Sequence, residues 1–244
     1  MTTWKVRSLR LTLFLPSDAA PKVSGLQWEE LTGAKPENVM NRGDQQSQEG
    51  PFPPGRLLLQ KQLPGRLDIV YAGFPKPEQR EDPVATLGTF EPAFEAFRTV
   101  AHKLFDRVGS SVRLALGAEM VQPADTALAA YRTLIGHIGS ATFKVEGGSE
   151  FVYQINRPRN SKTLPGLLIN RVARWNASSW QPVTFELTGG ARILSGPLSV
   201  GAVITTDVNT DAERTNPLPE DKLAGLIDEL RDLTLEIRDK GDIP

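Results

Sequence analysis

Residues 56–72 read RLLLQKQLPGRLDIVYA, and this stretch decides the fold that the sequence predicts. Two apolar runs, at 56–63 and 66–72, flank the dipeptide Pro64-Gly65. Proline and glycine between two strand-like runs are typical of a tight turn, so the two runs are predicted to form a β-hairpin. Because the strands of a hairpin are antiparallel, the stretch predicts an antiparallel sheet.

The rest of the chain adds strands and helices to this hairpin. Leu9, Leu11, Leu13 and Leu15 alternate with other residues, which predicts a strand with one buried face. Further strands are predicted at 112–116, 151–155, 167–175, 182–187 and 198–206. Apolar residues at helical spacing predict helices at 92–108, 123–138 and 219 to about 240, with a short helical turn at 26–31. The stretches 41–55 and 73–86 are predicted to be exposed loops.

The order of these elements indicates the fold class. Strands come in hairpin-like groups instead of alternating singly with helices, which predicts an α+β protein with a mostly antiparallel sheet and helices packed on one face. Each half of the chain contains several strands followed by a helix, as two similar halves would, although no residue-level repeat is present. We expect one domain over residues 1–244, and either an internal boundary at 139–149 or one continuous sheet fits the sequence.

Composition excludes several classes of protein. The 244 residues include no cysteine, so disulfides, thiolate zinc sites and cysteine nucleophiles are excluded. The start of the chain, MTTWKVRSLRLTLFLP, is interrupted by Lys5, Arg7 and Arg10 and is predicted to be a strand instead of a signal peptide. No apolar run approaches the ~18 residues that a membrane span needs. We therefore expect a cytoplasmic protein with no membrane partner.

Charge is segregated along the chain, although its formal net value is only −1. Residues 151–185 contain no Asp or Glu, and from Asp207 to the end acidic residues outnumber basic ones eleven to five. The residues of the basic stretch that are candidates for partner binding are Arg157, Arg159, Lys162, Arg174, Trp175 and Trp180. This separation makes the basic stretch the surface most expected to meet a partner.

Three interpretations of the basic stretch stay open. Its cations could neutralise phosphates while the tryptophans stack on bases, they could bind an acidic protein, or they could pair with the acidic end of the same chain. Arg171 and Arg174 lie three apart on a predicted strand, so they point to opposite faces of the sheet. The balanced overall charge, with a pI of about 6.2, favours internal pairing because nucleic-acid-binding domains are usually basic.

No catalytic motif stands out. His102 and His137 lie on predicted helices without the HExxH spacing of a zinc site, and no G-x-S-x-G motif accompanies them. The pairs Gly147-Gly148 and Gly189-Gly190 belong to no phosphate-binding fingerprint. Asp207 and Asp211 are weak metal candidates, since an Asp-rich stretch after a strand more often forms turns. No cofactor is predicted.

Three stretches together resemble hypothetical bacterial proteins of similar length. They are LQWEELTGAKPEN (26–38), PGRLDIVYAG (64–73) and LPEDKLAGLIDELRDLTLEIRDKGDIP (218–244). The group is sporadically distributed, and its members end in an Asp-containing strand and an acidic helix. The resemblance implies a bacterial source and a role in a mobile or accessory system such as phage defence, and it transfers no functional residues.

The expected function is a non-catalytic interaction or scaffolding role in a bacterial multiprotein system. The long amphipathic C-terminal helix could dock on a partner groove or on the chain's own sheet, and self-association is another outcome of the charge asymmetry. One alternative is a nucleic-acid-binding accessory protein that uses the basic segment 157–174. Another is an enzyme of unrecognised type, with Asp207, Asp211 or His137 in a cleft and Tyr153 and Arg174 as further site candidates.

Overall fold

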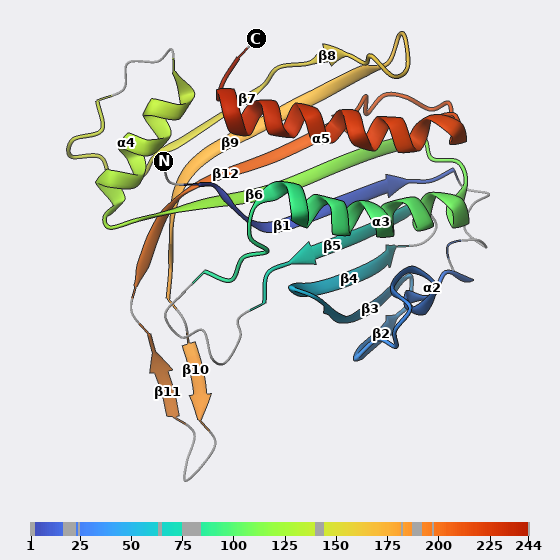
Figure 1. The fold of residues 1–244 in the computed structure, drawn as a ribbon, viewed down its shortest axis with the longest axis horizontal. Coiled ribbons are helices and arrows are strands. Elements are labelled where there is room, and N and C mark those ends of the chain that lie inside the picture. The colour runs from blue at the N-terminus through green and yellow to red at the C-terminus, as the bar shows by residue number, and fades with distance from the viewer. Residues whose placement is uncertain are drawn as a thin grey trace.

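The computed structural model describes residues 3–16, 23, 25–62, 65–74, 84–139, 144–181, 183–186, 192–196 and 198–243. They form an α+β protein built on one ten-stranded antiparallel sheet with helices packed against it (Figure 1), which confirms the predicted class and strand direction.

Strands from both ends of the chain share this sheet. In spatial order they are β2 (Asn38–Arg42), β3 (Gln45–Phe52), β4 (Gly55–Gln62), β5 (Arg66–Ala72), β1 (Lys5–Phe14), β6 (Arg113–Ala124), β12 (Ser199–Thr210), β9 (Leu168–Trp180) and β7 (Val152–Asn156), with β8 (Arg159–Asn160) also paired to β9. A separate two-stranded sheet of β10 (Val183–Glu186) and β11 (Arg192–Ser195) projects beyond β9 and β12 (Figure 1). Strands that precede residues 139–149 and strands that follow them therefore share one sheet, because β6 and β12 pair directly.

Four helices of the described residues pack against the sheet. They are α2 (Trp28–Thr32), α3 (Phe90–Val108), α4 (Ala127–Ile138) and α5 (Leu223–Lys240), the last preceded by a 3₁₀ turn at Glu220–Lys222. Helices α3 and α5 lie side by side (Figure 1), and Arg98 of α3 pairs with Asp228 of α5 at 2.8 Å. Their apolar stripes pack onto one core, in which Leu9, Leu11 and Leu13 of β1 are fully buried. Alternation along β1 therefore places its polar residues on the opposite side of the sheet.

The predicted hairpin exists as β4 and β5, with Gln62 opposite Arg66. Pro64 lies outside the described residues, as does most of the predicted loop 73–86. Strands β6 and β12 are longer than predicted, and α4 begins at Ala127 because the Thr126 hydroxyl accepts a hydrogen bond from the Ala129 amide.

One predicted loop is wrong. Residues 41–55 were expected to be irregular, but most of them belong to the paired strands β2 and β3. Every residue of β2 is exposed, so this edge strand has no apolar alternation for a sequence pattern to detect. The pairing of β3 with β4 holds this stretch in the sheet instead.

None of the helices in the described residues is long and apolar enough to cross a membrane.

Candidate functional site

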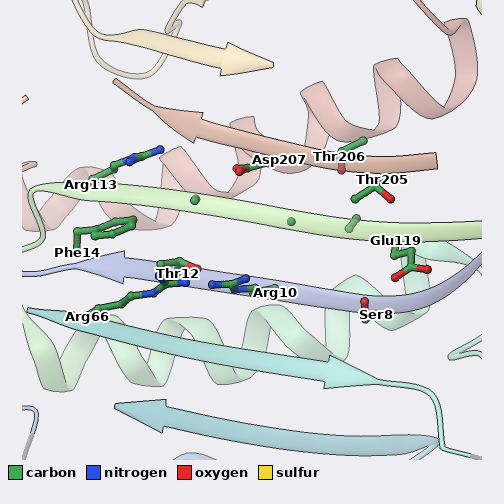
Figure 2. A pocket seen from close by; sticks show the side chains of 13 residues that line it. Ser8, Arg10, Thr12, Phe14, Arg66, Arg113, Glu119, Thr205, Thr206 and Asp207 are labelled. Atoms are coloured by element: carbon green, nitrogen blue, oxygen red, sulfur yellow. The ribbon is translucent and has the colours of Figure 1, made fainter. Parts of the chain in front are cut away.

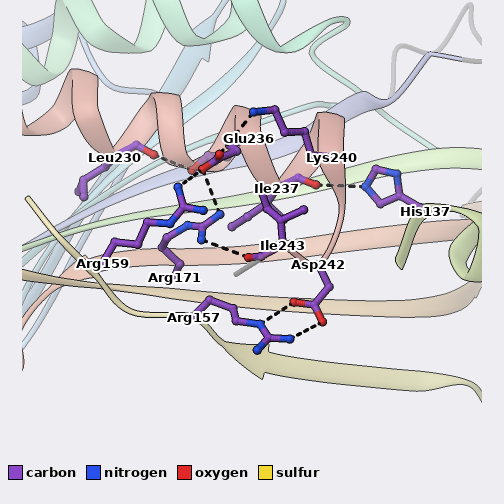
Figure 3. A network of polar contacts seen from close by, with 11 residues as sticks. His137, Arg157, Arg159, Arg171, Leu230, Glu236, Ile237, Lys240, Asp242 and Ile243 are labelled. Atoms are coloured by element: carbon purple, nitrogen blue, oxygen red, sulfur yellow. Dashed lines mark hydrogen bonds and ion pairs between the residues drawn. The ribbon is translucent and has the colours of Figure 1, made fainter. Parts of the chain in front are cut away.

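The basic stretch pairs with the acidic end of the same chain (Figure 3). Arg157 donates two hydrogen bonds of 2.9 Å to the Asp242 carboxylate, and Arg159 reaches Glu236 at 2.6 Å. Arg171, which is only 1% exposed, also contacts Glu236 at 3.2 Å. The intramolecular interpretation of this stretch is therefore the one that the contacts support.

Lys162 takes part in the same docking through its backbone. Its amide and the Ser161 hydroxyl each donate a hydrogen bond of 2.6 Å to the Glu229 carboxylate on α5. The loop between β8 and β9 is thus held on the C-terminal helix. These contacts use the backbone amide of Lys162 and not its ammonium group.

The other candidates of the stretch do not join this cluster. Trp175 is 1% exposed and faces the core, so the proposed stacking role is wrong for this ring. Trp180 is half-buried beneath the Arg7 guanidinium, 5.3 Å from the ring centroid. Arg174 is exposed on the other side of the sheet from Arg171, as the spacing predicted, and has no hydrogen-bonding or ionic partner among the described residues. The six candidates therefore lie at four separate places.

The histidines make structural contacts. His137 Nε2 donates to the carbonyl oxygen of Ile237 at 3.1 Å, and its ring packs against Trp4. Burial lowers the pKa of His137, so the imidazole is neutral where it joins α4 to α5. His102 packs beside Phe105.

The aspartates act in turns and in local hydrogen bonds. Asp211 accepts a hydrogen bond of 3.0 Å from the Glu213 amide, which is a side-chain turn, and Asp207 Oδ1 accepts one of 2.9 Å from the Asn209 amide group. In the described ranges, no three His, Asp or Glu side chains come together as metal ligands would. Asp207 and Asp211 therefore belong to no such cluster among the described residues.

The side of the sheet away from α3 and α5 carries a hollow of about 460 Å³ (Figure 2). We call this side the open face. Its central residues come from three neighbouring strands, β1, β6 and β12, and are mostly polar. Residues that are far apart in the sequence meet here because cross-strand partners lie on the same side of a sheet.

A row of mostly polar side chains, interrupted by one phenylalanine, crosses one end of the open face, and we call it the polar ladder. It consists of Asn156, Asn170, Asn209, Arg113, Phe14 and Arg66, which come from β7, β9, β12, β6, β1 and β5. Asn156 donates to Asn170 at 3.0 Å, while Asn170 and Arg113 both donate to the Asn209 oxygen, at 3.3 and 2.9 Å. The amides are thus hydrogen-bonded from strand to strand.

Phe14 continues the polar ladder between two arginines. It lies directly opposite Arg113 on β6 and Arg66 on β5. Their guanidinium carbons are 4.9 and 5.7 Å from the ring centroid, within the range of cation–π contacts. The ring therefore fixes two guanidinium groups on adjacent strands.

Positive charge exceeds negative charge at this end of the open face. Arg10 and Arg66 share one buried carboxylate, that of Asp68, at 2.8 Å each. Arg113 bonds only the neutral Asn209 side chain, and its Nε is buried without a partner among the described residues. Three guanidinium groups thus face two carboxylates, Asp68 and Asp207.

Sequence reasoning missed this arrangement because its arginines are spread over about half of the chain. Arg10, Arg66 and Arg113 have no common motif, and only the register of β1 with β5 and β6 brings them together. The one local signal is alternation, since each polar residue follows or precedes a buried leucine.

No family model matches this chain, and no curated protein or solved structure is significantly similar to it.

The Asp242 pair predicts a pH effect on stability. Hydrogen bonds from Arg157 lower the pKa of Asp242 in the folded protein. A carboxyl group of this kind contributes stability above its unfolded pKa of about 3.9, and the contribution is lost as the pH falls further. We expect Asp242→Asn to unfold at lower urea than the wild type at pH 7, with a difference that shrinks below about pH 4.

Urea midpoints at pH 7, 5 and 3 measure this effect. Asp232→Asn is the control, because that carboxylate is 65% exposed and pairs only with the neighbouring Arg231 in the described residues. A gap between Asp242→Asn and wild type that stays constant down to pH 3 would contradict the assignment.

Proposed function

We propose that this chain is a non-catalytic accessory protein that binds nucleic acid on the open face, with the sugar-phosphate backbone along the polar ladder. The observation that carries the proposal is the Arg113–Phe14–Arg66 arrangement, in which two guanidinium groups are held on one aromatic ring. The interaction role expected from the sequence is retained, and the binding surface moves from the basic stretch to the sheet. The bacterial accessory system and the cytoplasmic location remain part of the proposal.

The chemistry of the polar ladder suits this ligand. Arginine binds phosphate through bidentate hydrogen bonds, and asparagine and arginine are the side chains that read base edges. An acidic protein would also be attracted by guanidinium groups, but binding its carboxylates does not require a row of side-chain amides. The amide-rich composition therefore favours nucleic acid.

The dimensions also fit a strand of nucleic acid. The polar ladder spans six neighbouring strands, from β7 to β5. Five intervals of about 4.8 Å give a length of roughly 24 Å. Domains that bind single strands cover about 4–16 nucleotides, and a row of this length can contact several consecutive phosphates.

The overall charge does not oppose the proposal. The pI of 6.2 reflects the acidic C-terminal region, and its helix α5 packs on the other side of the sheet. Arg157 and Arg159 pair with that region, so they do not add to the charge of the open face. Local excess, not net charge, attracts a polyanion to one surface.

We further infer that the helices share one side of the sheet and that the chain has two similar halves. Arg171 on β9 contacts α5, His137 on α4 contacts the end of α5, and α3 pairs with α5. Both halves run strand, helix, further strands, helix, and their first strands, β1 and β6, pair at the centre. The open face would then be a composite of both halves, as a single extended binding surface requires.

Loss of the two arginines of the polar ladder is expected to weaken binding. For Arg66→Gln/Arg113→Gln we expect roughly tenfold lower affinity for a fluorescein-labelled single-stranded oligonucleotide, since each change removes a charged hydrogen-bond donor. For single strands, each lost phosphate contact also reduces the salt dependence of log K by about 0.7. Fluorescence anisotropy at 50 to 200 mM NaCl measures both quantities.

Arg157→Gln/Lys162→Gln is the matched control, with the same change of charge on the basic stretch. It should leave affinity and salt slope near those of the wild type. If this control lowers the affinity and the ladder variant does not, the nucleic acid binds at the basic stretch and our placement is wrong. Absence of binding at 50 mM NaCl would reject the function itself.

A further inference from the structure

A second row of the open face has the geometry of a base-binding site. Gly117 on β6 lies directly opposite Arg10 on β1 and Asp207 on β12, so the three residues form one line across the sheet. Figure 2 shows Arg10 and Asp207 on the strands that flank β6. We propose that Arg10, Gly117 and Asp207 form a seat for an unpaired guanine base. This inference rests on the proposed function and names the base that the open face selects.

Gly117 leaves space that nothing else in the structure requires. It is not among the glycines with positive φ, so its backbone conformation is open to other residues. An added Cβ would lie 3.6 Å from Arg10 Cβ and 3.6 Å from the Thr206 carbonyl oxygen, which is ordinary contact. Neither backbone strain nor packing therefore explains a glycine in the middle of a strand, where it weakens the sheet. Close approach of a ligand to the backbone does explain it.

The two walls of the seat have opposite chemistry. Arg10 holds Asp68 through Nε and Nη2, which leaves Nη1 as a donor, and its side chain is 45% exposed. Asp207 is exposed, and its Oδ1 accepts from Asn209, while Oδ2 has no hydrogen-bond partner among the described residues. Because β6 separates their strands, the walls are about 9.6 Å apart at the backbone. A flat ring above Gly117 would meet a donor on one side and an acceptor on the other.

Guanine presents two acceptors and an amino group to these walls, whereas cytosine, which also has an amino group and an acceptor on opposite edges, presents only one acceptor. Its O6 and N7 accept hydrogen bonds on one edge, and its amino group donates on the opposite side. Arginine is the commonest partner of O6 and N7, and a carboxylate accepts from amino groups. Thymine offers only acceptors on both of its groove edges, and adenine carries its amino group on the same edge as N7. In a duplex the two edges of guanine lie in different grooves, so only an unpaired base can meet both walls at once.

The seat lies within reach of a backbone bound on the polar ladder. Asp207 is two residues from Asn209 along β12, and Gly117 is four residues from Arg113 along β6. At about 3.4 Å per residue these separations are roughly 7 and 14 Å. A strand that crosses the sheet along the polar ladder would thus turn its bases towards the seat.

The test compares two labelled probes by anisotropy, a 12-mer of thymidine and the same 12-mer with one central guanine. We expect the wild type to bind the guanine probe at least about fivefold more tightly, the lower end of the range for a bidentate base contact. In Gly117→Val, which fills the seat, and in Asp207→Asn, which removes the charged acceptor, this ratio should fall towards one. Asp232→Asn, on the exposed side of α5, should keep the wild-type ratio.

Each outcome decides between the two proposals. Equal affinity of the wild type for both probes overturns the seat and leaves the proposed function standing. A guanine preference that survives in both seat variants, each with a wild-type circular dichroism spectrum and melting curve, overturns its location. A third probe carries one central cytosine in place of the guanine, and tighter binding of this probe than of the guanine probe overturns the base assignment. If neither probe binds at 50 mM NaCl, the proposed function fails and the seat with it.

Discussion

Glu236→Ala is expected to lower the free energy of unfolding by about 3 kcal/mol, because it removes the salt-bridge partner of a buried guanidinium. Arg171 is 1% exposed, and Glu236 is its only carboxylate partner among the described residues, at 3.2 Å. Burial already lowers the pKa of Arg171, which shows how unfavourable its surroundings are for a charge. The same substitution removes a second ion pair, since Arg159 also pairs with Glu236 at 2.6 Å.

Urea denaturation of Glu236→Ala, Glu236→Gln and Asp232→Ala measures this effect. Glu236→Gln keeps an oxygen acceptor and should lose less, while Asp232→Ala removes an exposed carboxylate and should lose less than about 1 kcal/mol. The double variant Arg171→Met/Glu236→Leu should recover most of the stability, because apolar residues can replace a buried pair. An equal loss for Glu236→Ala and Asp232→Ala would show that Arg171 does not depend on this carboxylate.

Trp175→Ala is expected to destabilise the protein by about 3–5 kcal/mol, as large-to-small changes of buried aromatic residues do. The ring lies in the core, with its centroid 5.6 Å from that of Tyr153, and alanine would leave a cavity between β9 and the helices. Nucleic-acid affinity of the folded variant should match the wild type, because the ring faces away from the open face. Thermal melts and anisotropy below the melting temperature test both statements.

Trp175→Phe separates packing from hydrogen bonding. The indole Nε1 has no hydrogen-bond partner among the described residues, so phenylalanine loses volume but no bond. We therefore expect it to cost much less than alanine. A folded Trp175→Ala protein with intact stability and weakened oligonucleotide binding would restore the stacking role and contradict the core assignment.

Regular patterns made much of the fold predictable. Leu9, Leu11 and Leu13 define the buried side of β1 through a period of two, and helix 219–240 has an apolar stripe that faces the core. Both signals are local, because each involves only residues within two helical turns or within a few positions of one strand. The strands that the sequence did not predict are β2, β3, β8 and β11.

The candidate site was far less predictable. Clustering of Arg157, Arg159 and Lys162 in the sequence drew attention to the basic stretch, but their partners Asp242, Glu236 and Glu229 are 67 to 85 residues away. Sequence reasoning favoured internal pairing from the overall charge, but it could not identify which acidic residues are the partners. The distance in space between two charged side chains decides which residues pair, and a local sequence pattern does not contain this distance.

The sequence by itself determined the antiparallel α+β class, the helices and most strands, and the segregation of charge, because these depend on residue type and short-range spacing. Only the tertiary structure decided which charges are neutralised internally and which remain on the open face. Strand register determines which residues lie together on the open face. Arg10, Gly117 and Asp207 become neighbours only when β1, β6 and β12 pair at one particular offset. A shift of one residue would send each of these side chains into the core.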